Sequence, residues 1–250
     1  MALWEHFCFV LCVVLATFAQ NTTGFAFGLL LLGLTGLMGI ASVETVANVS
    51  SLLTLANAVV LVRRWPQLAP HLLAIVLGCS LLGVVAGVFF LSVIGAHERE
   101  LLQLLLGVTI VACSLLLVVR SHARQRISGW VSFSCFAGIS GIMGGLFSSA
   151  GPPLVYQLYR QPLSVQVIRD TLVVVFAANA LARLGAVLLT QRFDQHSAYL
   201  ALEAMPVVFG LTWFMRLRPP TISPQVLRWI VFALLLLSGV SLIARAVGRI

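Results

Sequence analysis

The sequence predicts an all-α polytopic integral membrane protein made of two homologous tandem halves. Hydrophobic residues make up 60% of the 250 positions and charged residues only 9%, whereas a soluble domain carries about 25% charged residues. Apolar runs long enough to cross a bilayer recur from one end of the chain to the other. The polar connections between these runs are too short to fold as a soluble domain.

Cutting the apolar runs at polar or proline-containing connections predicts ten helical segments. Each half starts with a long segment that breaks and resumes as a short one, and three long transmembrane segments follow. The first segment is interpreted as a helix, because Glu5 and His6 stand where a cleaved signal needs basic residues. The predicted segments are about 4–20, 25–40, 43–62, 70–93, 100–119, 130–148, 152–160, 164–190, 197–215 and 224–246.

An internal repeat supports the two halves. A shift of 122 positions aligns Ala56–Ala58 with Ala178–Ala180, and both stretches read Ala-Asn-Ala. The same shift aligns the lengths of the apolar segments in the two halves. The predicted halves are therefore residues 1–122 and 123–250. Their relative orientation is open: parallel halves favour a cytoplasmic N-terminus, and inverted halves an external one. Inverted halves are favoured, because the short segment after each break cannot span a bilayer.

Both halves interrupt their first helix with small and polar residues, in AQNTTGFAFG (Ala19 to Gly28) and GGLFSSAGPP (Gly144 to Pro153). Non-helical backbone at membrane depth persists only where protein or a water-filled cavity satisfies it, and paired breaks in two halves indicate a transporter binding site. Glycines admit a ligand, hydroxyls donate hydrogen bonds, and Pro152 suits the first turn of a new helix. The alternative, that these residues only allow close helix packing, is less favoured.

Ionisable residues within the spans are the next candidates, because a charge at mid-bilayer is normally turned inward or paired. Arg169 is expected to line an anion pathway, and Asp170 either to neutralise an arginine or to balance charge. Arg183 and Asn179 lie on the same helix stripe as Arg169. For Arg183, extension of the side chain to the far membrane interface is at least as well favoured.

In the first half, Glu44, Asn48, Ser51 and Asn57 form one polar stripe. A buried Glu44 could carry a coupling proton, but an acid at a helix start is more often a cap-region charge, and that interpretation is favoured. Glu203 is a second candidate for proton coupling.

Composition and motifs exclude several function classes. The net charge of +8 comes from fifteen arginines without a lysine, placed mostly in short connections such as Arg63–Arg64 and Arg120–Arg126, where charges set topology. Nucleic acid is therefore not an expected partner. No sequence motif of an intramembrane enzyme is present, and we expect no catalytic residue, metal or cofactor. The five cysteines lack metal-ligand spacing and are interpreted as small core residues.

The stretch GISGIMGGLFSSAGPPLVYQLYRQPLSVQVIRDTL resembles the signature of the sulfite exporter TauE/SafE family, and AQNTTGFAFGLLLLGL is similar to the family's first arm. The resemblance covers nearly the whole chain. It implies secondary transport of sulfite, sulfonates or related organic anions, usually outward, and it strengthens the choice of Arg169. One departure is Ser148-Ser149-Ala150, where family members often carry more glycine, which leaves the size and identity of the ligand open.

The sequence therefore predicts an exporter that binds a small anion between two broken helices near mid-membrane. The alternatives are a passive anion channel and a transporter of small carboxylates. We expect a multi-pass protein of the cell membrane, with the bacterial inner membrane as its location and a homodimer as one assembly. The predicted substrate-binding residues are Asn21, Thr22, Thr23, Gly24, Phe25, Asn57, Gly144, Gly145, Ser148, Ser149, Gly151, Pro152, Arg169 and Asn179. Candidates for proton coupling or charge balance are Glu44, Asp170 and Glu203.

Overall fold

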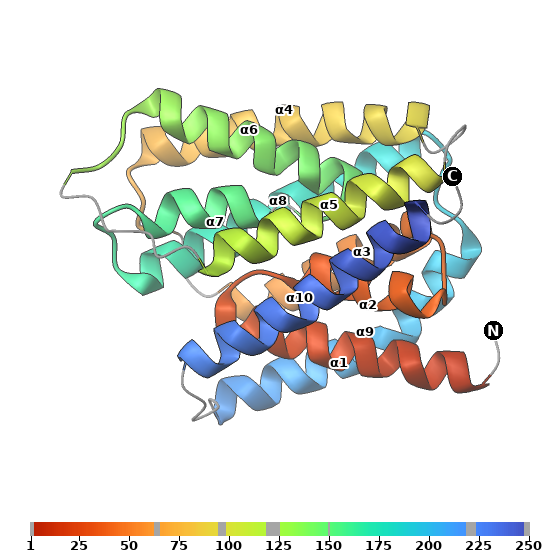
Figure 1. The fold of residues 1–250 in the computed structure, drawn as a ribbon. Helices are drawn as coiled ribbons and strands as arrows, with labels where there is room; N and C mark the ends of the chain where they lie inside the picture. Colours follow the sequence, from red (N-terminus) through yellow and green to blue (C-terminus); the bar gives the residue numbers. More distant parts are fainter. Residues whose placement is uncertain are drawn as a thin grey trace.

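A computed structural model of the chain describes residues 3–62, 66–94, 99–118, 126–149, 151–218 and 224–247. Within these ranges the chain forms ten helices and no strand, and each predicted segment becomes one helix (Figure 1). The predicted Arg63–Arg64 pair, Ala150 and most of the Arg120–Arg126 connection lie outside the described residues. The helices are α1 (Leu3–Thr23), α2 (Phe27–Met38), α3 (Val43–Leu61), α4 (Pro70–Ile94), α5 (Arg99–Val118), α6 (Trp130–Phe147), α7 (Pro152–Tyr159), α8 (Val165–Leu189), α9 (Gln195–Leu217) and α10 (Pro224–Val247).

Seven helices in the described part of the chain are long and apolar enough to cross a membrane. The prediction of an all-α, multi-pass membrane protein is confirmed at this level. Helices α2 and α7 have only 12 and 8 residues. At 1.5 Å per residue they extend about 18 Å and 12 Å, well short of the roughly 30 Å hydrocarbon core of a bilayer.

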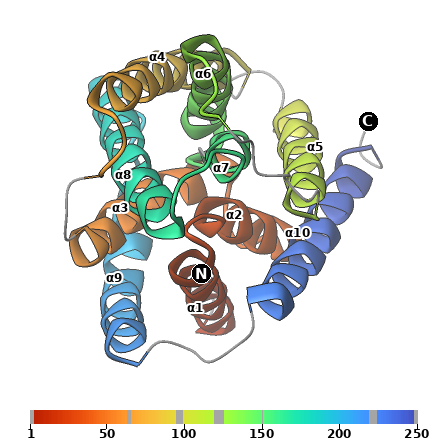
Figure 2. The same cartoon turned by 90° about the vertical axis from the view of Figure 1, so that its left-hand side faces the viewer.

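The two short helices lie inside the bundle, surrounded by the longer ones (Figure 2). Helix α2 carries four consecutive leucines, Leu29 to Leu32, and all four are buried. Four consecutive helical residues point in all directions around the axis, so α2 is covered by protein on every side. Along these four residues α2 is therefore enclosed by the longer helices.

Helices α3 and α8 begin in the same way. Each starts directly after a serine whose hydroxyl oxygen accepts a hydrogen bond from a backbone N–H three residues later. Ser42 accepts from Thr45 at 3.1 Å, and Ser164 accepts from Val167 at 3.3 Å. A serine N-cap satisfies one of the free N–H groups of a helix start. The two caps are 122 positions apart, the same shift that aligns the Ala-Asn-Ala segments.

The helices of the two sets of five pack in matching ways. Helix α1 packs on α9 as α6 packs on α4, and α3 packs on α9 as α8 packs on α4. The pairs α3–α8 and α5–α10 bring equivalent helices into contact. In Figure 1, α1 runs from the right of the view to the left, whereas α6 runs from left to right. The helices that follow α1 and α6 keep this opposition, so equivalent helices run in opposite directions (Figure 1).

The five cysteines are free. Cys8, Cys12 and Cys113 are buried and Cys79 is partly buried, as expected for small core residues. Cys135 is exposed, so its interpretation as a core residue is wrong. It lies on α6, on the side of that helix that faces away from the bundle.

Candidate functional site

The two helix breaks are shorter than predicted. Helix α1 continues through Thr23 and helix α6 through Phe147, so the breaks comprise residues 24–26 and 148–151. The placement of Thr22 and Thr23 in the first break is wrong. Their hydroxyls donate to carbonyl oxygens one turn back, Thr22 to Phe18 at 2.6 Å and Thr23 to Ala19 at 2.6 Å. The Thr23 hydroxyl also accepts from the Phe25 backbone N–H at 3.3 Å, so Thr23 belongs to the last turn of α1 and contacts the break that follows it.

Each break turns the chain with a residue in the left-handed backbone region. Ala26 has a φ of 82° and Ser148 a φ of 52°, and these two residues are also 122 positions apart. Gly24, with a φ of 83°, adds a second left-handed residue to the first break. A non-glycine residue in this region costs about 1–2 kcal/mol. Strained backbone of this kind persists where the surrounding structure holds it, and it is concentrated at functional sites.

The two breaks touch each other. A Cβ atom built on Gly28 would lie 2.6 Å from the carbonyl oxygen of Ser148 and 3.0 Å from the Cβ of Ser149. A Cβ on Gly151 would lie 3.5 Å from the side chain of Phe25. Glycine at position 28 is therefore required by the close approach of the two broken helices.

A cavity of about 30 Å³ lies between the breaks. Such a volume holds roughly two or three waters. Its polar lining consists of hydroxyl and amide side chains, and no carboxylate or cation is among its lining residues. The lining residues are Gln20, Phe25, Ala26, Phe27, Gly28, Thr54, Gly144, Ser148, Ser149, Gly151, Phe176, Asn179 and Ala180.

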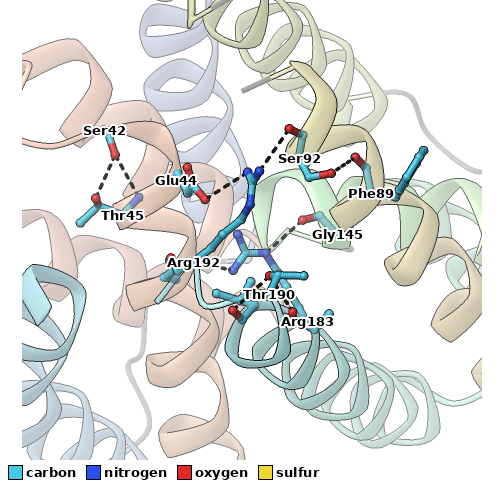
Figure 3. Close-up of polar contacts among 12 residues, drawn as sticks. Ser42, Glu44, Thr45, Phe89, Ser92, Gly145, Arg183, Thr190 and Arg192 are labelled. Carbon is cyan, nitrogen blue, oxygen red and sulfur yellow. Dashed lines mark hydrogen bonds and ion pairs between the residues drawn. The ribbon is translucent and has the colours of Figure 1, made fainter. Parts of the chain in front are cut away.

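A buried arginine lies behind one wall of this cavity. Arg183 on α8 is 0% exposed. Its Nε donates to the Gly145 carbonyl oxygen at 3.0 Å, and its Nη1 donates to Asn48 Oδ1 at 2.8 Å and to Ser51 Oγ at 3.2 Å (Figure 3). The guanidinium thus ties α8 to the last turn of α6 and to the polar stripe of α3.

Ser51 connects this arginine to the cavity wall. The Ser51 and Ser148 hydroxyl oxygens are 2.7 Å apart, a hydrogen bond in which either can donate. The single Ser51 proton can go instead to the Ala47 carbonyl oxygen, which lies 3.0 Å away. The left-handed turn at Ser148 therefore places its hydroxyl between the Arg183–Ser51 contact and the cavity.

Buried polar atoms without a hydrogen-bond partner among the described residues are the Nδ2 of Asn179, the Nη2 of Arg183 and the Oγ of Ser50. Asn179 and Arg183 are four residues apart on α8, which places them on one face of the helix. Asn179 Oδ1 accepts from the Ser80 hydroxyl at 3.0 Å, so only the Nδ2 of its side chain lacks a partner. Unpaired buried donors are costly and indicate a strained or ligand-binding site.

Six of the predicted substrate-binding residues line the cavity: Phe25, Gly144, Ser148, Ser149, Gly151 and Asn179. The structure does not place the others in the lining. Pro152 starts α7 at its first turn and is buried. Gly145 faces α4, where a Cβ atom would lie 2.7 Å from the Val88 nitrogen and 2.8 Å from the Gly87 Cα.

Asn21 and Asn57 belong to a separate polar cluster that joins α1, α3 and α9. Asn57 Nδ2 donates to Asn21 Oδ1 at 3.1 Å, and Asn57 Oδ1 accepts from the Thr212 hydroxyl at 2.7 Å. Asn21 Nδ2 donates to the Thr212 oxygen at 2.9 Å. The three side chains satisfy one another, and none of them lines the cavity.

Arg169 is exposed and also lies outside the cavity lining. Its Nη2 donates to the Thr22 carbonyl oxygen at 2.6 Å, and its Cγ would be 3.5 Å from a Cβ on Gly24. Arg169 therefore contacts the last turn of α1 at the first break. Its role in anion binding stays a prediction.

The three acidic candidates are separated from the cavity lining. Glu44 lies in the first turn of α3 and pairs with Arg192 at 3.9 Å (Figure 3). Glu203 Oε2 is 2.7 Å from the Nδ1 of His6, which joins α9 to α1. Within the described ranges, no ion pair joins Asp170 to an arginine. Their roles in proton coupling or charge balance stay predictions.

The sequence interpretation missed the placement of Arg183. Extension of its side chain to the membrane interface, an alternative that the sequence favoured at least as well as a place on the stripe of Arg169, is wrong, because three acceptors from α3 and α6 hold the guanidinium inside the bundle. The available signal was Asn48 and Ser51 on the matching polar stripe of α3. Gln20 and Thr54 were also missed as lining residues. Within the described residues, no group of three or more histidine, cysteine or acidic side chains could hold a metal ion.

Comparisons with known proteins give the family. Residues 9–242 match the profile of the family described as sulfite exporter TauE/SafE. A protein of Cupriavidus necator, described as a probable sulfite/organosulfonate exporter TauE, is 33% identical over 236 residues, which cover 93% of this chain and 91% of that protein. No solved structure matches the chain. The match spans both breaks and nearly all of the helices, and the chain therefore belongs to the sulfite exporter TauE/SafE family.

Proposed function

We propose that the protein is a secondary transporter that exports sulfite, sulfonates or related small organic anions. The observation that carries this function is the cavity between the two breaks, whose polar lining is hydroxyl and amide groups without a carboxylate. Such a lining offers hydrogen-bond donors to an oxyanion and no repulsive charge. The family, and the Cupriavidus necator relative described as a probable sulfite/organosulfonate exporter, point to the same class of substrate.

The transport mechanism we infer is alternating access by two inverted halves, residues 1–122 and 123–250. Opposite directions of equivalent helices, the matching serine caps of α3 and α8, and left-handed turns at Ala26 and Ser148 support this organisation. In transporters with inverted repeats, the site lies where discontinuous helices meet near mid-membrane. The cavity between two breaks corresponds to such a site.

The size of the cavity limits which anions can bind without a movement of the two breaks. Its volume of about 30 Å³ accepts only a small head group. A sulfonate with a longer organic tail requires that the two breaks move apart on one side of the membrane. The glycines and left-handed residues of the breaks are the natural hinge positions. Rocking of one half against the other would then open the cavity to alternate sides, in the inner membrane of a bacterial cell.

The decisive test uses purified protein in liposomes. Sulfite, methanesulfonate, sulfate, acetate and a neutral solute are offered on one side, and uptake is measured with and without unlabelled anion on the other. We expect uptake of sulfite or methanesulfonate that is accelerated by counterflow. Uptake without counterflow acceleration would indicate a channel, and transport restricted to a cation or a neutral solute would contradict the function altogether.

A further inference from the structure

Arg183 is a buried cation that forms no ion pair within the described part of the chain. The ion pairs found there join His6 to Glu203 and Arg192 to Glu44. The hydrogen-bond acceptors of Arg183 are a backbone carbonyl, an amide and a hydroxyl, all of them neutral. Taking a charge out of water costs several kcal/mol, and neutral dipoles repay only part of this cost. Glu44 attracts the guanidinium electrostatically without forming an ion pair with it, but Glu44 also pairs with Arg192, so the two arginines and one carboxylate leave one positive charge in excess.

This charge is connected to the cavity by two hydrogen bonds. Arg183 Nη1 donates to Ser51 Oγ at 3.2 Å, and Ser51 is 2.7 Å from the hydroxyl of Ser148 in the cavity wall. When Ser51 donates its single proton to Ser148 and not to the Ala47 carbonyl oxygen, the Ser148 O–H is free to donate into the cavity. Asn179, one turn earlier on α8, adds an amide without a partner to the same wall.

Two other arginines, one near the start of α8 and one just after its end, differ from Arg183. Arg169 is exposed, so water screens its charge. Arg192 lies 3.9 Å from the carboxylate of Glu44, which offsets its charge. Arg183 is fully buried, and Glu44, the carboxylate that acts on its charge, is shared with Arg192, so one positive charge is left over.

We propose that Arg183 supplies the positive charge of the cavity and thereby selects ligands with a single negative charge. It is a positioning residue, because it acts on the ligand through Ser51 and Ser148. One negative charge balances the guanidinium. A second would remain uncompensated in a low-dielectric site, where the energy of an unpaired charge is high. The inference rests on the proposed binding of anions, and it names singly charged oxyanions such as sulfonates as the substrate class.

Three molecules of nearly equal shape separate charge from size. Dimethyl sulfone is neutral, methanesulfonate carries one negative charge and sulfate carries two. Binding to the purified full-length protein is measured by calorimetry, together with the melting temperature of each variant. For the wild type we expect methanesulfonate to bind at least about tenfold more tightly than sulfate or dimethyl sulfone, a difference of 1.4 kcal/mol or more.

The variants test the residue itself. Arg183→Gln should weaken methanesulfonate binding at least about tenfold, and Arg183→Lys, which keeps the charge, should recover part of this loss. Arg216→Gln on α9 is the control, because that arginine is exposed and lies outside the cavity lining, and it should stay within about threefold of the wild type. A purely structural role would lower the melting temperature of Arg183→Gln without changing the preference among the three molecules.

Ser51→Ala is a second variant, and it tests the role of Arg183 even if Arg183→Gln does not fold. It removes the link to Ser148 and keeps the contacts of Arg183 with Gly145 and Asn48, and binding should weaken about two- to tenfold. Wild-type affinity in folded Arg183→Gln, or in Ser51→Ala, would overturn the inference, as would equal binding of sulfate and methanesulfonate by the wild type. A wild-type protein that binds none of the anions would instead overturn the proposed function.

Discussion

Arg169 and Arg183 lie on the same helix, and each donates a hydrogen bond to the last turn of a different broken helix. Arg169 reaches the Thr22 carbonyl oxygen near the end of α1, and Arg183 reaches the Gly145 carbonyl oxygen near the end of α6. The C-terminal end of a helix carries partial negative charge, which arginine stabilises. Helix α8 therefore holds the ends of both broken helices, and a displacement of α8 would be felt at both breaks.

Gly28→Ala should reduce anion binding by forcing the two breaks apart. The added Cβ would lie 2.6 Å from the Ser148 carbonyl oxygen, a backbone atom that cannot move without shifting the second break. We expect at least about a tenfold loss of affinity for methanesulfonate, from a shift of a few tenths of an ångström at the wall. Gly185→Ala is the control, because a Cβ there has nothing within 4 Å. Equal affinities of the two variants would show that the close approach of the breaks does not matter for binding.

Ser149→Ala should weaken anion binding with little effect on folding. Ser149 is buried and lines the cavity, and no hydrogen bond to another described residue holds its hydroxyl there. A hydrogen bond to a charged ligand is worth about 1.5–3 kcal/mol, so a loss of roughly ten- to a hundredfold is expected by calorimetry. Ser134→Ala is the matched control, because that hydroxyl is exposed and bonds only to the Trp130 carbonyl oxygen at 3.0 Å. An unchanged dissociation constant in Ser149→Ala would remove this residue from the site.

Gly145→Ala should destabilise the protein through the α4–α6 contact. Its Cβ would lie against backbone atoms of α4, at 2.7 Å from the Val88 nitrogen. Overpacking of this kind costs about 1–3 kcal/mol, which should appear as a lower melting temperature in detergent. Gly138→Ala on the same helix has open space at its Cβ and should be neutral or slightly stabilising. If both variants melt at the same temperature, the two helices are less tightly packed than the structure has them.

Asn57→Ala should lower stability and leave the affinity of the remaining folded protein within about threefold of the wild type. The substitution leaves Asn21 and Thr212 with unpaired groups, at a cost of about 1–3 kcal/mol. A double-mutant cycle with Thr212→Ala measures the coupling between the two side chains, expected at about 0.5–3 kcal/mol. Additive effects would contradict the hydrogen bond, and a large loss of anion affinity in folded protein would restore Asn57 to the binding site.

The helices were predictable because their signals are local. Long apolar runs, serines at the starts of α3 and α8, and proline at the start of α7 are all visible in the sequence. The exact ends of the breaks were not predictable, because Thr22 and Thr23 form hydrogen bonds within α1 that suit a helix as well as a loop. Gly144 and Gly145 likewise belong to the last turns of α6.

The candidate site was only half visible, because its geometry depends on contacts between distant segments. The repeat makes Asn57 and Asn179 equivalent in sequence. In the structure, Thr212 and Asn21 satisfy Asn57 at both ends, whereas Ser80 satisfies only one end of Asn179. Arg183 could not be placed from its position six residues before the end of α8, because its partners come from α3 and α6. Hydrogen bonds between segments distant in sequence therefore decide both the difference between Asn57 and Asn179 and the position of Arg183.

The fixed position of Arg183 has an electrical consequence. The guanidinium is held by three hydrogen bonds to the protein, so it stays in place when a bound anion leaves. An anion that crosses alone then carries its own charge through the membrane voltage, uncompensated by any travelling cation. Each elementary charge gains about 2.3 kcal/mol per 100 mV, and a potential that is negative inside drives an anion outward. At that voltage a singly charged anion would be driven to a roughly fiftyfold outward gradient without a coupled proton.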